Sequence, residues 1–426
     1  MFTKKSKMKS RFIKNLLFFL FFLFFYLLGL YRLPKIIIPE GKAVKISGLV
    51  TQQTYHKASK QIIRLGPVFI TTNLYPGYFY GDKLTVIGSF KEKVINPFYI
   101  QYFASFPAIQ LEKENLSLTG KTELTRFLLK TRRQIENRIK RFLPENESGL
   151  LLGVLLGVKT DLPENFWQSL RKTGTIHLIV ASGQNVVFIA SIIMSICLWF
   201  LSRKKALILT LVFILLYVLM AGGEAPVVRA GLMVSLAFVS QLFGREGDSF
   251  RFLLISAAFM LLVSPLILFD IGFQLSFGAT AGLILVSPKL KDLAPRFFAL
   301  PLLGEGLALT LSAQIMTLPI LFANFGQFSW LSPLINSLVL PIIPLIMVLG
   351  LVVVLLSFLL MPLAQLLSWL IFPFLTYFVH VTNLFGSLKG ISWEIGIIPL
   401  WYFLPYYFLI FFWVFKKKNN VRLINS

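Results

Sequence analysis

The sequence predicts a polytopic α-helical membrane protein that carries a small β domain near its N-terminus. The chain of 426 residues is 56% hydrophobic and only 14% charged, whereas about a quarter of a soluble globular chain is charged. Apolar runs recur that have about 20 residues, the length of a membrane-spanning helix. We expect about ten spans and a short re-entrant or interfacial helix. The N-terminal part from residue 35 has no such run and predicts an extracytoplasmic domain.

A basic segment and a first apolar run form residues 1–34. The run from Leu16 reads LLFFLFFLFFYLLGLYRLP and follows KKSKMKSRFIKN. It is too long for the apolar part of a signal peptide, and no small-residue cleavage site follows it. We therefore expect a retained membrane span that starts in the cytoplasm. The single cysteine, Cys197, excludes an internal disulfide.

Residues 35–118 predict a small β domain. Apolar and polar residues alternate there, with many β-branched residues, in KAVKISGLV, PVFITTNLY, DKLTVIGSF and, more weakly, FYIQYFASF. Gly and Pro separate these stretches. The pattern predicts about five strands, and a compact barrel is the arrangement that it favours.

A basic amphipathic helix is expected within residues 119–145. Its sequence is KTELTRFLLKTRRQIENRIKRFL, in which leucine, isoleucine and phenylalanine recur at helical spacing beside many lysines and arginines. Such a helix lies on a membrane surface or binds an anion. The pattern alone leaves both open.

The membrane bundle is expected over residues 146–416, followed by a basic tail at 417–426. GLLLGVLLGV is too short to span, and DLPENFWQSLRKTG predicts a short helix with Asp161 as N-cap and Gly174 as its end. The further spans are expected at residues 176–201, 205–222, 226–243, 251–266, 268–286, 299–322, 332–357, 364–386 and 398–415.

Loop charges predict the orientation. The loops SRKK, GREGDSFR and PKLKDLAPR and the terminal KKKNN are basic and alternate with the loops AGGEAP, NFGQFS and SLKGISWEIG, which carry one lysine. Because positive loops stay inside, both termini are expected in the cytoplasm. The net charge is +24, and the basic outer region indicates either an anionic substrate or anionic lipid.

Polar residues cluster on one face of the span that begins near Thr175. At about 100° per residue, His177 and Gln184 share a sector with two serines, and Asn185 lies at its edge. Ser182-Gly183 interrupts this helix, and an interrupted helix exposes backbone amides to a ligand. The face predicts a pore or site lining. For His177 alone, a hydrogen bond to a neighbouring helix is the alternative.

Three more stretches carry polar groups at membrane depth, where such groups are expensive unless paired or wetted. Arg229, in EAPVVRAGL, could meet an anionic substrate or extend to the outer interface. Asp270 and Gln274 lie one helical turn apart, and an Asp270–Arg229 ion pair competes with a direct transport role. Gln314 shares a face with two threonines, where hydrogen bonds between helices are the ordinary explanation.

Enzyme signals are weak. The three histidines, His56, His177 and His380, are far apart, and the sequence has neither a zinc-hydrolase motif nor a P-loop. Ser182 and His177 do not share a helix face as a nucleophile and its base would. We expect no catalytic residues, no metal and no cofactor.

Four ordered motifs between residues 149 and 345 resemble the ComEC-type competence channel family. The first is FWQSLRKTGTIHLIVASGQNVVFIA, where the family reads Arg-x-Thr-Gly and then His-Leu-Leu-Ala-x-Ser-Gly-Leu-His-Val. The others are PVVRAGLM, SPLILFDIGFQLSFGATAGL and AQIMTLPILFANFGQFSWLSPLINSLVLPII. One departure is visible: the second histidine of the first motif is replaced, because Gln184-Asn185 stands where the family has Leu-His.

The resemblance implies a channel or translocase component that carries single-stranded DNA across the cytoplasmic membrane during natural transformation. It implies an OB-like outer domain, and it implies a DNA receptor and a cytoplasmic ATPase as separate proteins. Many members continue into a metallo-β-lactamase-like nuclease domain, whereas this sequence shows no metal motif, so we expect a separate nuclease. The chain could also form a homo-oligomer. A transporter or enzyme acting on lipid or glycan is the rival function for the same bundle.

DNA contact in the outer region requires cations for phosphates and aromatic rings for bases. Tyrosines of a small β domain also serve as its core, so this role competes with packing. The candidates are Lys45, Arg64, Tyr78, Tyr80, Lys130, Arg132 and Arg133.

Overall fold

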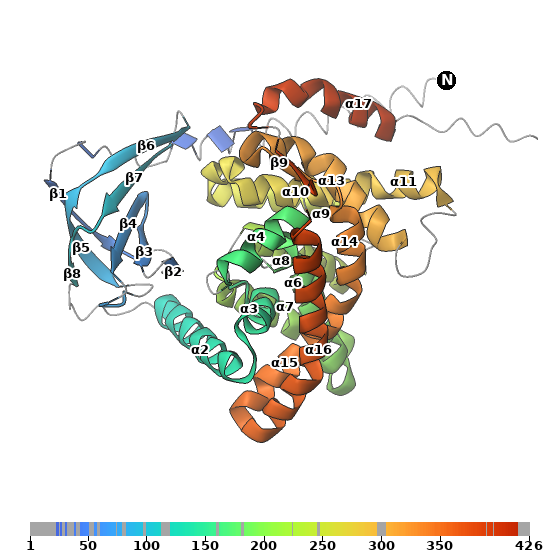
Figure 1. Cartoon of the computed structure of the whole chain (residues 1–426), viewed down its shortest axis with the longest axis horizontal. Coiled ribbons are helices and arrows are strands. Elements are labelled where there is room, and N and C mark those ends of the chain that lie inside the picture. Colours follow the sequence, from blue (N-terminus) through green and yellow to red (C-terminus); the bar gives the residue numbers. More distant parts are fainter. Residues whose placement is uncertain are drawn as a thin grey trace, which may run out of the picture.

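The computed structural model shows a group of strands beside a large helical bundle, with one long helix near both (Figure 1). It describes residues 23–415 except 25, 28–29, 32–37, 40–42, 51–54, 58–59, 74, 79–81, 97–98, 112–119, 159–161, 180–182, 224, 245–247, 296–303, 389 and 395. The basic start, the terminal tail and most of the first predicted span therefore lie outside the described residues.

The β region contains two sheets. Its strands are β1 (Ala43–Leu49), β2 (Tyr55–Lys57), β3 (Lys60–Leu65), β4 (Val68–Asn73), β5 (Lys83–Ser89), β6 (Lys91–Asn96), β7 (Tyr99–Ser105) and β8 (Ala108–Leu111). One sheet has the order β1-β5-β8 and the other β2-β3-β4-β7-β6. All neighbouring strands run antiparallel except β4 and β7, which are parallel.

The four stretches that alternate in the sequence form β1, β4, β5 and β7, as predicted. The predicted closed barrel is wrong for the described strands, which form two separate sheets. Alternation predicts a half-buried strand, but closure depends on which distant strands pair, and periodicity does not contain that information. The core between the sheets includes Ile63, Ile70 and Val86, each completely buried.

The basic helix is present as α2 (Gly120–Phe142). The short apolar segment forms α3 (Glu145–Leu156), which is buried from Glu147 onward. It is followed by α4 (Glu164–Thr173), which ends at Gly174 as predicted. Gly174 has φ +71°, a left-handed conformation that glycine adopts without strain. The predicted N-cap Asp161 lies outside the described residues.

The bundle continues with helices of unequal length. They are α5 (Ile176–Ile179), α6 (Gly183–Phe200), α7 (Arg203–Met220), α8 (Ala225–Leu242), α9 (Ser249–Val263), α10 (Ile271–Leu285), α11 (Ser287–Leu293), α13 (Gly304–Phe325), α14 (Ser332–Val339), α15 (Ile343–Leu359), α16 (Met361–Gly386) and α17 (Leu404–Phe415). Short 3₁₀ helices cover Pro265–Phe269, Leu340–Ile342 and Leu400–Phe403.

Five segments of the described chain are long and apolar enough to cross a membrane, or six if the bent pair α10–α11 counts as one span. They are Ile176–Phe200, Ala225–Leu242, Gly304–Phe325, Ser332–Leu359 and Met361–Gly386. The predicted number of about ten is therefore not confirmed by the described residues. Two expected spans, for example, form helices of only 15 and 12 residues, α9 and α17, which are shorter than a bilayer requires.

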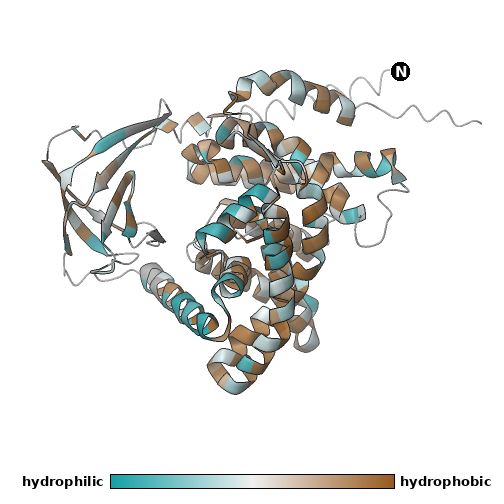
Figure 2. Cartoon of the chain, in the orientation of Figure 1, coloured by the Kyte–Doolittle hydropathy of each residue, from teal (hydrophilic) through white to brown (hydrophobic). Residues whose placement is uncertain are grey.

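Hydropathy supports a membrane setting for the bundle. Hydrophobic residues dominate its helices, whereas α2 is largely hydrophilic (Figure 2). Large apolar side chains point outward on the bundle, among them Trp199, Phe213 and Phe408. An apolar outer surface matches lipid, where each backbone group must be satisfied within its own helix.

Two chain segments far apart in the sequence meet in a small ribbon. Strand β9 (Gln327–Ser329) pairs antiparallel with β10 (Ser392–Glu394). These strands lie in the loops NFGQFS and SLKGISWEIG, which the loop charges assign to the same side. The pairing agrees with that assignment.

Candidate functional site

Arg229 is a buried cation on α8 of the helical bundle. It lies in the second turn of α8, and only 7% of its surface is exposed. Its Nη1 donates to the carbonyl oxygen of Ser276 on α10 at 2.9 Å, and its guanidinium carbon lies 5.9 Å from the ring centre of Phe277. Its Nε is buried without a hydrogen-bond partner. A guanidinium has five N–H donors, so this one is only partly satisfied.

Gly183 lies against the same guanidinium. It is the first described residue of α6, and the predicted interruption of the helix stays a prediction. A Cβ atom built on Gly183 would lie 2.1 Å from Nη2 of Arg229 and 3.3 Å from Cβ of Ala230. The residues just before Gly183, including Ser182, lie outside the described residues. A larger residue at position 183 would therefore have to shift the guanidinium of Arg229.

Three motif segments thus meet at one side chain. Gly183 belongs to the first motif, Arg229 to the second, and Ser276 to the third. The fourth motif lies one helix further on, because α13 packs against α10. Gln314 is half-buried on α13, and no contact with Arg229 is found for it among the described residues.

Asp270 and Gln274 make hydrogen bonds to the backbone at the start of α10. Oδ1 of Asp270 accepts from the backbone N–H of Phe273 at 2.8 Å, an N-cap bond. Nε2 of Gln274 donates to the carbonyl oxygen of Leu268 at 2.9 Å. The alternative of an Asp270–Arg229 ion pair is not found among the described residues. Asp270 is exposed and Arg229 is buried.

The predicted polar face of the first motif divides into two parts. His177 and Gln184 are exposed on the surface of the chain, and Nδ1 of His177 lies 2.9 Å from the carbonyl oxygen of Gly174. Asn185 turns inward instead: it is buried, and its Nδ2 donates to the carbonyl oxygen of Val154 on α3 at 2.7 Å. The lining role of the exposed part stays a prediction, whereas Asn185 joins two helices.

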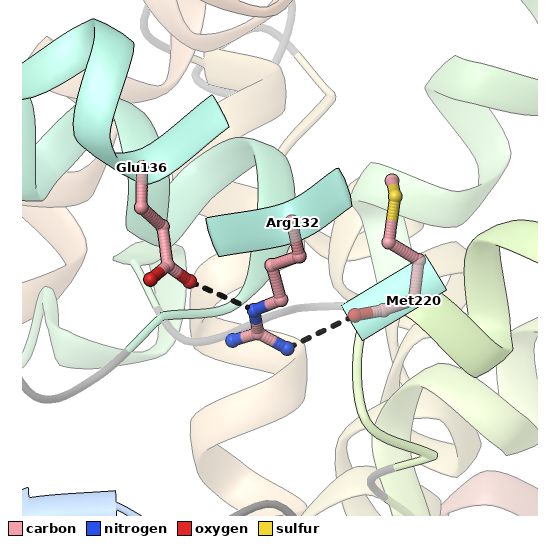
Figure 3. A network of polar contacts seen from close by, with 3 residues as sticks. All are labelled: Arg132, Glu136 and Met220. Carbon is pink, nitrogen blue, oxygen red and sulfur yellow. Dashed lines mark hydrogen bonds and ion pairs between the residues drawn. The ribbon is translucent and has the colours of Figure 1, made fainter. Parts of the chain in front are cut away.

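The basic helix α2 contacts the bundle through arginines (Figure 3). Arg132 is buried; its Nε pairs with Oε1 of Glu136, and its Nη1 donates to the carbonyl oxygen of Met220, both at 3.0 Å. Arg138 donates to the carbonyl oxygen of Ser357 and lies over the ring of Phe358. Met220 ends α7 and Ser357 lies in the last turn of α15, where carbonyls lack helical partners. Arginines at these ends also complement the helix dipoles.

These contacts correct the predicted orientation. The loop-charge scheme assigns the end of α7 and the end of α15 to opposite sides of the membrane. Arg132 and Arg138 reach both ends from one helix, and they are about 9 Å apart along it. The hydrocarbon core is about 30 Å thick, so the scheme fails for at least one of the two helices. The loop-charge scheme assumes that each apolar run crosses the membrane completely, and this assumption does not hold for the fold.

The other outer candidates differ in accessibility. Lys45 and Lys130 are exposed. Arg64 lies 5.1 Å from the ring centre of Phe69, whereas Tyr78 is buried in the β core. Burial does not favour base stacking by Tyr78, and burial with two partners does not favour phosphate contact by Arg132. Tyr80 lies outside the described residues.

Arg133 is half-buried on α2 near the β region. Burial lowers the pKa of its guanidinium, while the negative charges of Glu136 and Asp82 raise it. Asp82 directly precedes β5. Arg133 thus lies within electrostatic range of the β region, and its DNA contact stays a prediction.

The structure bears on the prediction of no bound metal only for the residues that it describes. Among the residues that the structure describes, no group of three His, Cys, Asp or Glu side chains is placed to hold a metal ion.

The site residues that the sequence analysis missed are Ser276 and Phe277. Both belong to the third motif, so the signal was present, but their contact with Arg229 requires the packing of α8 on α10.

Residues 154–419 match the family described as "Competence protein", and this is more than half of the 426 residues. The chain belongs to this family. It is 31% identical over 215 residues to "ComE operon protein 3" of Bacillus subtilis, which covers 50% of this chain and 27% of that protein. It is 27% identical over 202 residues to "Competence protein ComA" of Neisseria gonorrhoeae, covering 45% of this chain and 28% of that protein.

A third relative carries a different name. "Recombination protein 2" of Haemophilus influenzae is 27% identical over 147 residues, which is 32% of this chain and 18% of that protein. The chain therefore aligns with less than a third of each of these relatives. No solved structure matches it.

Proposed function

We propose that this competence-family protein carries single-stranded DNA across the cytoplasmic membrane as a component of a channel or translocase. The observation that supports this most directly is Arg229, a cation kept inside a bundle of membrane-length helices without a carboxylate partner among the described residues. Ionisable residues at this depth usually mark the path of a substrate or ion. DNA carries one negative charge per nucleotide, which a buried cation attracts.

Gly183 adds a second element, because it lies directly against the guanidinium of Arg229. The interruption that the sequence predicts at Ser182-Gly183 would expose backbone amides next to this contact, and such amides favour negative charge. Together with the guanidinium they would form a positive site in an apolar surrounding, which suits a passing phosphate chain.

The proposal also covers the membrane location and the partners of the protein. It spans the bacterial cytoplasmic membrane several times, acts without a cofactor or an enzymatic activity of its own, and works with a separate DNA receptor, nuclease and cytoplasmic ATPase. Gln184 and Ser191 are exposed on α6, and a second copy of the chain facing them would shield these polar groups from lipid. A homo-oligomer fits that arrangement.

The test is DNA uptake by cells that carry Arg229 variants. We expect Arg229→Ala to abolish transformation while the protein remains at its normal level in membranes. Arg251→Ala is the matched control, because Arg251 is a surface arginine with an 80% exposed side chain that pairs with Asp248. Normal uptake by the Arg229→Ala strain would refute the proposed role of this arginine. Deletion of the whole gene with no loss of transformation would refute the proposed function itself.

A further inference from the structure

One line of paired residues crosses four strands of the five-stranded sheet. Arg64 on β3 pairs with Phe69 on β4, Phe69 pairs with Phe103 on β7, and Phe103 pairs with Lys91 on β6. Side chains of directly paired residues lie on the same face of a sheet. These four residues, named here the cation–aromatic row, therefore present two rings between two cations.

The row is packed as a stack. The rings of Phe69 and Phe103 have centres 5.3 Å apart and are only 16° from parallel. The guanidinium carbon of Arg64 lies 5.1 Å from the centre of the Phe69 ring. Phe103, at the other end of the pair, is 38% exposed. Among the described residues, no second ring besides that of Phe69 is found stacked on Phe103.

The opposite face of these strands forms the core, so the row lies on the outer face. The neighbouring positions Ile63, Ile70 and Ala104 pair with one another and are buried. Near the row, the Lys60 ammonium lies 5.1 Å from the ring centre of Phe106, which is also exposed. The four members of the row include no carboxylate, and the surface is basic and aromatic together.

We propose that the cation–aromatic row binds single-stranded DNA, with a base stacked on Phe103 and phosphates beside Arg64 and Lys91. This rests on the proposed function for the identity of the strand. Aromatic rings within a positive groove are what sequence-tolerant single-strand binding requires. A duplex keeps its bases stacked inside and offers none to the ring. Cross-strand aromatic pairs also stabilise a sheet, so the test must separate binding from folding.

The experiment uses the full chain in detergent or lipid nanodiscs and measures affinity by fluorescence anisotropy. The probes are a labelled oligothymidylate, an abasic strand of equal length and a duplex. We expect Phe103→Ala to weaken binding of oligothymidylate about fivefold or more and to leave abasic-strand binding unchanged. Ile87→Ala is the control, since Ile87 is 37% exposed on the other sheet.

The cations give an independent measurement that does not alter the apolar packing of the ring pair. Arg64→Gln or Lys91→Gln should weaken binding of both single strands and reduce the slope of log affinity against log salt by about one. Phe103→Trp should retain or strengthen binding of oligothymidylate, because tryptophan offers a larger stacking surface. Thermal unfolding of each variant shows whether the fold is intact.

Three results would overturn the proposal: equal affinity for oligothymidylate and the abasic strand, equal affinity for the duplex, or no effect of Phe103→Ala in a folded protein. The last is also the result expected if the row contacts lipid instead. Binding by the row without any transport role would leave this inference standing and refute the proposed function, because binding is measured on purified protein and uptake in cells.

Discussion

The guanidinium of Arg229 occupies the space that a side chain of residue 183 would fill. A Cβ atom on Gly183 would lie 2.1 Å from Nη2 of Arg229, far inside van der Waals contact. The start of α6 and the buried cation of α8 therefore depend on each other. Because Nη1 of the same group donates to Ser276, one side chain fixes three helices from three motifs.

Gly183→Ala should reduce transformation strongly although the substitution is chemically small. Alanine in a helix is ordinarily more stable than glycine by about 0.5–1 kcal/mol, but here the methyl group would meet Nη2 of Arg229, so the guanidinium must shift from its present position. The measurement is transformation frequency together with thermal unfolding of the purified protein. Ser191→Ala, an exposed change on the same helix, should behave as wild type. A fully active Gly183→Ala protein would show that the contact is dispensable.

Asn185→His should be tolerated, whereas Asn185→Leu should be destabilising. Asn185 stands where the family motif has its second histidine, and it donates to the carbonyl oxygen of Val154 from a buried position. An imidazole N–H can make the same bond. Leucine removes the donor, and leaving a buried polar group unpaired reduces the free energy of unfolding by about 1–3 kcal/mol. Unfolding in detergent should rank the variants as wild type, histidine, then leucine, and equal stability of all three would contradict this reading.

The sequence predicted those features that depend on local pattern. The strands β1 and β4, the helix α2 and the end of α4 at Gly174 all follow from periodicity or from glycine. Each requires only the residues within a few positions of it. The polar residues of the membrane motifs were found in the same way, because a charge within an apolar run is visible by itself.

What the sequence missed depends on contacts between distant segments. Arg132 was predicted to contact DNA, and Arg138 belonged to a helix predicted to meet a membrane surface or an anion. Both instead bind helix ends that lie far along the chain. The sequence shows these positive charges. It does not show what they bind, because each partner is a backbone carbonyl without a sequence signature. The prediction of a closed barrel and the orientation scheme for α7 and α15 failed for the same reason.

Arg132→Met should destabilise the protein more than the double substitution Arg132→Met with Glu136→Met. The single change leaves the Glu136 carboxylate largely buried without its partner, and breaking a buried ion pair costs about 3–5 kcal/mol. Replacing both partners by apolar groups removes that penalty. The readout is thermal unfolding, with Lys130→Met on the exposed side of α2 as control. If the double variant were the less stable one, the attraction between Arg132 and Glu136 would stabilise the protein by more than it costs to remove the two charges from water.

Gly282→Val should separate α10 from α13. A Cβ atom on Gly282 would lie 2.3 Å from the carbonyl oxygen of Ser312, which is backbone and cannot move aside alone. Gly278 is one turn earlier on the same face, so the pair forms a small-residue stripe of the kind that lets membrane helices approach closely. Overpacking of such a contact costs about 1–3 kcal/mol or more, and we expect a lower unfolding temperature and less protein in membranes. Gly278→Ala is the matched control, because its Cβ would meet nothing nearer than 3.4 Å and should leave stability within the range of a surface change. Equal stability of Gly282→Val and Gly278→Ala would mean that the two helices do not pack as closely in the membrane as they do in this fold.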